Sequence, residues 1–283
     1  MGWLPDLPDP RDYTPAHDTV RALLGGLPRP GNQDLPDSVD LRSDDEGVYV
    51  VPSDDQGTIN CSAACAVCGL VEYFERRVRG QTFEGSRLFL YRMARKLRRH
   101  GASLLENSGA DLRNTLKSLK SFGLPSEQFW PFDSEHLDRE PEQFVYAAAK
   151  RFDGLCYFRI SPPDELPAST VAVLKSFLAS GFPIAFGFSV PSSLSIGPDI
   201  PFRPGFDSIR GGQAALAVGY RNDHLGRGQD AFLIQTSWGR QWGDNGIGWL
   251  PASYVRHGMA RDFWTLLSSD WSDGEVLSSP CRE

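Results

Sequence analysis

The stretch DQGTINCSAACAVCGLVEYF, residues 55–74, decides the fold of this chain. Asn60 and a glycine before it break the chain, and Ala, Val, Leu and Phe then recur at helical spacing. The pattern predicts a helix from about Ser62 to Arg77. Residues 1–54, which precede it, are rich in Pro, Asp and Gly and predict an extended N-terminal arm that packs on the body.

Helical periodicity continues after this stretch. It covers residues 86–100, whose charged and apolar faces separate well, and then residues 110–123 and 141–151. Gly123 and the proline two positions later end the second of these helices. The sequence therefore predicts a mainly helical subdomain over residues 55–154.

The pattern changes at residue 155. Short β-rich runs, separated by Gly, Pro and Asp turns, cover residues 157–160, 183–190, 214–220 and 231–238. One helical pattern, residues 169–180, lies among them. We expect a β-rich subdomain over residues 155–270 and a C-terminal tail over residues 271–283.

Composition narrows the classes of partner. The chain has 283 residues, a formal net charge of -7 and a pI near 5.3, so it offers no large positive field to nucleic acid or anionic lipid. Its first residues, MGWLPDLPDPRDY, lack the basic patch and apolar run of a secretory signal. We expect a cytoplasmic protein with no nucleic-acid partner, no membrane contact and no cofactor.

We expect the five cysteines to be reduced thiols, since their number is odd and three fall within eight residues. Cys61, Cys65 and Cys68 lie at i, i+4 and i+7 of the predicted helix, which could suggest a metal site. Three thiols on one helix face lack the spread that tetrahedral zinc requires, and no nearby His completes a motif. Packing in the core is the favoured interpretation, and no metal is expected.

A helical half followed by a β half, with residues 55–74 opening the first, resembles the two-domain papain-like (C1) peptidases. Residues 55–74 look like the Gln-Gly-x-x-x-x-Cys entry of the bacterial branch of that family. Further blocks that resemble the family lie at residues 86–91, 107–123, 181–190, 211–220, 235–251 and 262–266. The resemblance implies an α+β fold with a helical left domain, an antiparallel β-barrel right domain and a cleft between them.

The positions that carry catalysis in that family differ here. Six residues after Gln56 the family's catalytic Cys position is Ser62, and Cys61 comes one residue early. The position of the catalytic His, after Gly-Gly, is Gln213, and the position of the orienting Asn, before Ser-Trp-Gly, is Thr236. By resemblance, all three triad positions are replaced.

These replacements remove the nucleophile and the base that peptide hydrolysis requires. A serine hydroxyl needs a general base to become a nucleophile, and the amide of Gln213 cannot accept the proton. Loss of nucleophile and base as a unit costs roughly 10⁶-fold in rate. We expect no useful peptide hydrolysis at Ser62.

Other features of the family's cleft are retained. Gln56 occupies the position that supplies the oxyanion-hole amide. The positions that the resemblance implies for ligand contact are Gly109, Ala110, Cys61, Gly212 and Trp238. Trp238 and its neighbouring tryptophan could equally be scaffold packing.

Three hypotheses follow for the function. The first is a non-catalytic protein that binds a peptide, a partner protein or a small molecule in the cleft. The second is a repurposed lyase, cyclase or transferase that uses the polar set Gln56, Ser62, Gln213 and Thr236. The third is a residual thiol peptidase acting through Cys61 or Cys65, and the histidine near the relevant strand is His224, eleven residues after Gln213. The sequence leaves the ligand and the oligomeric state open.

Overall fold

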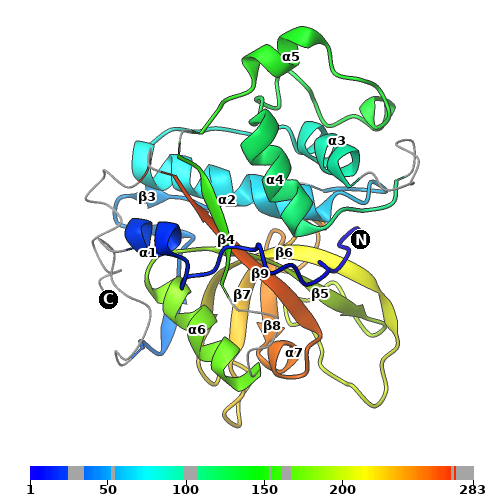
Figure 1. Cartoon of the computed structure of the whole chain (residues 1–283). Helices are drawn as coiled ribbons and strands as arrows, with labels where there is room; N and C mark the ends of the chain where they lie inside the picture. Colours follow the sequence, from blue (N-terminus) through cyan, green and yellow to red (C-terminus); the bar gives the residue numbers. More distant parts are fainter. Residues whose placement is uncertain are drawn as a thin grey trace.

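The computed structural model describes residues 1–24, 35–51, 55–98, 107–152, 154–160, 167–268 and 271. Figure 1 shows helices α2 to α5 on one side, an antiparallel sheet on the other, and the N-terminal residues crossing between them. The helices are α1 (Asp18–Leu24), α2 (Ser62–Arg79), α3 (Arg87–Leu97), α4 (Leu112–Phe122), η1 (Ser134–His136), α5 (Gln143–Ala148), α6 (Pro167–Ala179) and α7 (Ser253–Arg256).

The sheet contains seven strands. They follow the order β4-β9-β5-β6-β7-β8, and β1 pairs with β6 off this path. Strands β2 (Ser43–Asp44) and β3 (Gly47–Val48) form a separate pair. The seven strands are β1 (Ser38–Asp40), β4 (Cys156–Arg159), β5 (Ile184–Pro191), β6 (Ile209–Arg221), β7 (Ala231–Gln235), β8 (Ile247–Pro251) and β9 (Ala260–Leu267).

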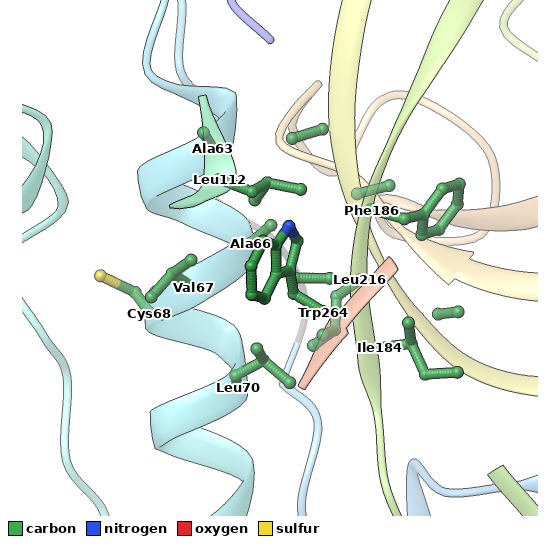
Figure 2. Packing of buried hydrophobic residues seen from close by; sticks show 14 of the residues in the cluster. Ala63, Ala66, Val67, Cys68, Leu70, Leu112, Ile184, Phe186, Leu216 and Trp264 are labelled. Carbon is green, nitrogen blue, oxygen red and sulfur yellow. The ribbon is translucent and has the colours of Figure 1, made fainter. Parts of the chain in front are cut away.

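Helix α2 is the central element of the core. Its residues Ala63, Ala66 and Leu70 are among those packed against the sheet side chains in Figure 2, which include Leu216 and Trp264. Because the alanines on this face are small, the backbone of the helix can approach the sheet closely. Burial of this face, and not helix propensity alone, holds α2 in place.

The two ends of α2 are formed differently. Cys61 is the N-cap residue, and its side chain makes no capping hydrogen bond. At the other end Gly80 adopts a left-handed conformation with φ of 62°, which glycine tolerates, and its N–H donates to the carbonyl of Arg76. The first turn of α2 therefore lies against the site described below without a local cap of its own.

The sequence analysis predicted the fold class correctly. The structure has α helices and an antiparallel sheet, so the α+β assignment is confirmed. The helices expected from residues 62, 86, 110, 141 and 169 are all present, with ends shifted by a few residues.

The N-terminal region differs by one helix from the extended arm that the sequence predicted. It contains helix α1, and β1 joins the main sheet through the pair Val39 and Tyr220. The predicted tail, residues 271–283, lies outside the described residues except for Trp271. The Trp271 ring is buried and stacks on Phe74 at 4.9 Å between centroids.

Within the ranges described above, no helix is both long and apolar enough to cross a membrane.

Candidate functional site

Three polar side chains that are distant in sequence meet where the first turn of α2 lies against β6. The Nε2 atom of Gln213 donates to Oε1 of Gln56 at 2.9 Å and to Oγ of Ser237 at 3.0 Å. The Ser237 hydroxyl donates to the same Gln56 oxygen at 2.6 Å, and Gln56 Nε2 donates to the carbonyl of Ile59 at 2.6 Å. All three side chains are at least 98% buried. The cluster is a neutral network that contains no ionisable group.

Ser62 lies beside this network as the first residue of α2. It is fully buried, and its Oγ accepts a hydrogen bond from the backbone N–H of Ala214 at 3.1 Å. Strand β6 therefore brings Gln213 and its neighbour Ala214 to the start of α2, where Ser62 lies.

Thr236 is placed differently from the sequence expectation. Its hydroxyl donates to the carbonyl of Gly246 at 3.3 Å, so its hydrogen bond leads away from the network. Ser237, the next residue, supplies the hydroxyl that contacts Gln56 and Gln213. The sequence analysis missed Ser237, and the available signal was its place in the Ser-Trp-Gly block.

One polar atom of the site has no partner. The Oε1 atom of Gln213 is buried and, among the described residues, accepts no hydrogen bond. A buried acceptor left in this state costs about 1–3 kcal/mol. A ligand that donates an N–H or O–H group to Gln213 Oε1 would recover part of that free energy.

The chain's own N-terminal residues, in dark blue in Figure 1, lie between Ala110 and Gly212. The N–H groups of Gly2 and Trp3 donate to the carbonyl of Gly212 at 2.9 and 3.2 Å. Opposite them, Leu4 N–H donates to Ala110 at 3.1 Å and Ala110 N–H donates to Gly2 at 2.8 Å. We call the space between Ala110 and Gly212 the groove, and residues 1–13 the N-terminal segment.

Glycines make this close approach possible. A Cβ atom at Gly109, where φ is +84°, would lie 2.5 Å from the carbonyl oxygen of Gly2. A Cβ at Gly212 would lie 2.6 Å from the Trp3 oxygen, and one at Gly187 only 1.8 Å from the Trp3 indole. The indole, with Trp3 only 7% exposed, therefore occupies room that any other residue at position 187 would take.

The structure thus places three of the expected ligand-contact residues, Gly109, Ala110 and Gly212, against a peptide segment. Trp238 makes its ring contacts with Phe188 at 6.0 Å and Trp242 at 4.6 Å. The sequence analysis predicted an arm packed on the body but not its entry into the groove.

Two of the three clustered thiols, Cys61 and Cys68, are not activated. Cys61 is fully buried and its sulfur lies 3.7 Å from that of Cys65. The hydrogen bond with Cys65, together with burial, raises the pKa of the Cys61 thiol well above its ordinary value. Burial raises the pKa of Cys68 in the same direction. Both thiols are protonated at neutral pH and are poor nucleophiles.

The described histidines have their ring contacts elsewhere. Their stacking or tilted partners are Tyr13 for His17, Trp130 for His136, Trp249 for His224 and Phe202 for His257. His100 lies outside the described residues. In the part of the chain that the structure describes, no cluster of three or more His, Cys, Asp or Glu residues could hold a metal ion.

A cavity of about 90 Å³ lies along α2 and reaches Ser237. Glu72 and Glu127 are in its wall, and burial raises the pKa of Glu72 to about 7. The Oε2 atom of Glu127 is buried without a partner among the described residues.

Comparisons with known proteins agree with this architecture. The sequence profile described as papain family cysteine protease matches residues 35–261. An uncharacterized peptidase C1-like protein of Acanthamoeba polyphaga mimivirus is 29% identical, over 94% of this chain and 86% of the relative. A cathepsin L-like proteinase of Fasciola hepatica is 26% identical over 85% of this chain, which spans 65% of that relative's length.

Solved structures give the same result. The crystal structure of xylellain, a cysteine protease from Xylella fastidiosa, superimposes with a TM-score of 0.74 and 28% identity. The match covers 95% of this chain and 96% of that one.

Proposed function

This chain belongs to the papain family of cysteine proteases, and we propose that it binds a peptide in its groove without cleaving it. One observation carries the proposal. The groove holds an extended peptide segment, residues 1–4, through backbone hydrogen bonds to Ala110 and Gly212, and the residue after Gly212 is Gln213 of the neutral network.

The absence of hydrolysis follows from the side chains in the network. Attack on a peptide carbonyl requires a nucleophile and a base that takes its proton. Ser62 accepts a hydrogen bond from Ala214, and the neighbouring Gln213 offers a carboxamide, which is not basic. The peptide bond therefore meets hydrogen-bonding groups that can hold it but no group that can generate an attacking anion.

Binding of another peptide requires only contacts that the groove already makes. The hydrogen bonds to Gly2, Trp3 and Leu4 involve backbone atoms alone. Any extended peptide presents the same donors and acceptors, as in other modes of recognition that pair a strand with exposed backbone. The occupant must first leave, so we expect an incoming peptide to compete with the N-terminal segment.

The thiol-peptidase hypothesis is not favoured by this geometry. Cys61 is buried directly before α2 and shares a hydrogen bond with Cys65, so its sulfur faces another thiol and not an imidazole. Its raised pKa keeps it protonated at neutral pH.

The repurposed-enzyme hypothesis remains as a second candidate because of Gln213. Its unpartnered Oε1 atom is a ready acceptor for a small polar substrate that enters beneath the N-terminal segment. Isolation of such a molecule bound at stoichiometric amount would favour this candidate over peptide binding.

The proposal also places the chain in the bacterial branch of the family and in the cytoplasm. The motif at residues 55–74 and the 28% identity to the Xylella protease support the first assignment. The second rests on composition and stays a prediction.

Restoration of the family's triad tests the proposal. The triple variant Ser62→Cys, Gln213→His and Thr236→Asn is built with Trp3→Ala, which weakens the occupant of the groove, and is compared with Trp3→Ala alone. With a fluorogenic peptide library, we expect hydrolysis from the restored variant and none from the control. Hydrolysis by the Trp3→Ala control would overturn the proposal. Lack of activity in both, with peptide binding intact, would show that the groove no longer positions a scissile bond.

A further inference from the structure

We propose that the groove and the surface beside it recognise one peptide pattern, an aromatic residue followed three positions later by a carboxyl-bearing residue. This inference rests on the proposed peptide-binding function and names its ligand class. The N-terminal segment, with Trp3 and Asp6, is the occupant in this structure, and a partner peptide with the same pattern takes its place.

The first anchor is the pocket that holds Trp3. Gly187 on β5 and Gly212 on β6 leave the space that the indole fills. The Trp3 Nε1 atom is buried and has no partner among the described residues. The pocket therefore selects an aromatic ring for its size and apolar surface, and not for a hydrogen bond.

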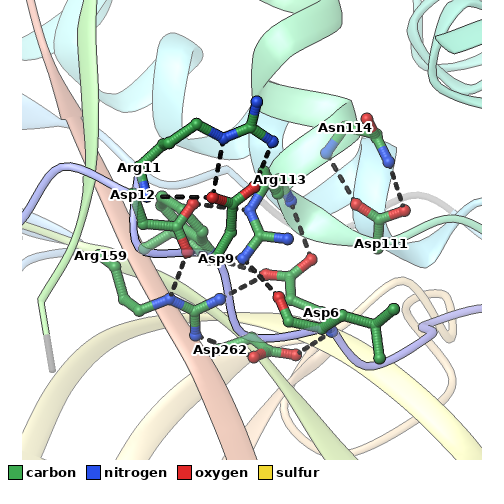
Figure 3. A network of polar contacts seen from close by, with 11 residues as sticks. Asp6, Asp9, Arg11, Asp12, Asp111, Arg113, Asn114, Arg159 and Asp262 are labelled. Atoms are coloured by element: carbon green, nitrogen blue, oxygen red, sulfur yellow. Dashed lines mark hydrogen bonds and ion pairs between the residues drawn. The ribbon is translucent and has the colours of Figure 1, made fainter. Parts of the chain in front are cut away.

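The second anchor holds the side chain of Asp6 in the network of polar contacts in Figure 3, and this side chain is fully buried. Its Oδ2 atom accepts from Arg159 at 3.0 Å and from the indole N–H of Trp264 at 2.8 Å. Its Oδ1 atom accepts from the backbone N–H of Arg113 at 3.3 Å. All three donors belong to the body of the protein, on β4, β9 and α4, so this carboxyl subsite is part of the scaffold.

Other residues of the body hold the hydrogen-bond donors of this subsite in position. Asp262 accepts from Arg159 at 2.9 Å, and its other oxygen accepts the backbone N–H of Asp6 at 2.8 Å. The Arg159 guanidinium lies 4.6 Å from the centroid of the Trp264 ring. An arginine held on both sides in this way is preorganised for a carboxyl group.

A third contact extends the recognised stretch. The Asp12 carboxylate accepts two hydrogen bonds from Arg113, at 2.6 and 2.5 Å, and one from Arg159 at 3.2 Å. Two guanidinium groups of the body therefore face two carboxyl groups of the N-terminal segment. The charges are complementary at Asp12, so this surface favours a carboxyl-bearing peptide over a basic one.

Between Asp6 and Asp12, the Leu7 carbonyl accepts from Arg113 at 2.8 Å, but the side chains of Leu7 and Asp9 form no hydrogen bond with described residues of the body. Leu7 is 80% exposed, and the Asp9 carboxylate forms its ion pair with Arg11 of the same segment. The pattern that is recognised is thus Trp3 and Asp6, strengthened by Asp12, while positions 7 and 9 tolerate substitution.

In the parent chain the N-terminal segment competes with any added peptide for the groove, and the experiment must remove this competition. A tethered occupant acts at an effective concentration of about millimolar. The parent chain should therefore bind a free peptide about 100-fold or more weakly than a full-length variant whose own segment is released. The released variant is the full chain with Trp3→Ala and Asp6→Ala.

The probe is a labelled synthetic peptide with the sequence of residues 1–13, and binding is followed by fluorescence anisotropy. Peptides with Trp3→Ala or Asp6→Ala should bind the released variant about tenfold or more weakly than the parent peptide. Peptides with Leu7→Ala or Asp9→Ala are matched controls and should bind within about twofold. These changes are made in the peptide, so folding of the protein does not affect the comparison.

The outcomes separate the two proposals. Equal binding of all peptides would overturn the aromatic and carboxyl pattern and leave peptide binding intact. Failure of every peptide to bind, with the released variant folded by circular dichroism, would overturn the proposed function as well. A concentration-dependent dimer of the parent chain that is lost in the released variant would assign the groove to a second copy and overturn the partner peptide.

Discussion

The Nε2 atom of Gln213 lies 2.9 Å from the Oε1 atom of Gln56 and donates a hydrogen bond to it. The two residues are separated by 157 positions, and this contact joins the entry of α2 to strand β6. An imidazole at position 213 would be a base, whereas the Gln213 amide is neutral and serves as a hydrogen-bond donor. The contact therefore stabilises the junction between these two elements.

The two glutamines should differ in their effect on stability. Gln56→Ala removes an acceptor shared by Gln213 and Ser237, so it leaves two buried donors unpaired. We expect a loss of about 2–4 kcal/mol in the free energy of unfolding, measured by urea denaturation. Gln213→Met removes the unpartnered Oε1 atom together with the donor and should cost clearly less. An equal cost for both variants would contradict the hydrogen-bond assignment.

Gly187 tests the pocket that holds Trp3. A Cβ at this position would lie 1.8 Å from the indole, so Gly187→Ala should expel Trp3 while β5 remains paired. We expect a red-shifted tryptophan emission and faster proteolysis within residues 1–13. Gly197→Ala is the matched control, because its Cβ would meet only the Ser195 hydroxyl, at 3.7 Å. An unchanged emission spectrum in Gly187→Ala would show that Trp3 is not held there.

Docking of the N-terminal segment should depend on pH through Asp6. Burial first, and then the neighbouring Asp262, raise the pKa of the docked Asp6 carboxyl to about 7, against about 3.9 for a free aspartate. A raised pKa in the docked state means that docking takes up a proton. The stabilisation is complete below about pH 4 and is lost as the pH rises towards 7.

Proteolysis of the N-terminal segment at a series of pH values measures this effect. Cleavage rates, corrected for the protease's own pH profile on an unfolded substrate, should increase from pH 5 to pH 8. The variant Asp6→Ala should lose most of that increase. A rate that falls with rising pH would contradict the sign of the Asp6 shift.

The buried thiols of Cys61 and Cys68 should react slowly in the folded protein. Cys61 and Cys68 are buried and their pKa values are raised, so iodoacetamide at pH 7.5 should label them only after unfolding. Mass spectrometry of tryptic peptides with and without urea locates the label. Rapid labelling of native Cys61 would support the thiol-peptidase hypothesis.

Sequence patterns predicted those helices and strands whose formation depends on the residues of a single stretch of chain. Helix α2 was found because its apolar spacing and the glycine before it act within one stretch. Strand β9 was not predicted as a strand, and the reason is visible at Asp262. This residue is charged and adopts a positive φ of 58°, which interrupts the β pattern.

Site residues could be predicted from the sequence where a motif identifies the position. They could not be predicted where the contact depends on which of two adjacent residues points towards the site. Ser62 and Gln213 were placed by their blocks. The hydroxyl that completes the network belongs to Ser237 and not Thr236, because adjacent residues of an extended chain point in opposite directions. Occupation of the groove left no sequence signal, since backbone hydrogen bonds to Ala110 and Gly212 require no particular side chain.

The most direct test of the central claim incubates the released variant, Trp3→Ala with Asp6→Ala, with the peptide of residues 1–13. Native mass spectrometry reports binding, and chromatography of the same sample reports cleavage. The account predicts a one-to-one complex from which the peptide is recovered intact after prolonged incubation. Repeated cleavage of the peptide, abolished by Cys61→Ser or by Ser62→Ala, would contradict it.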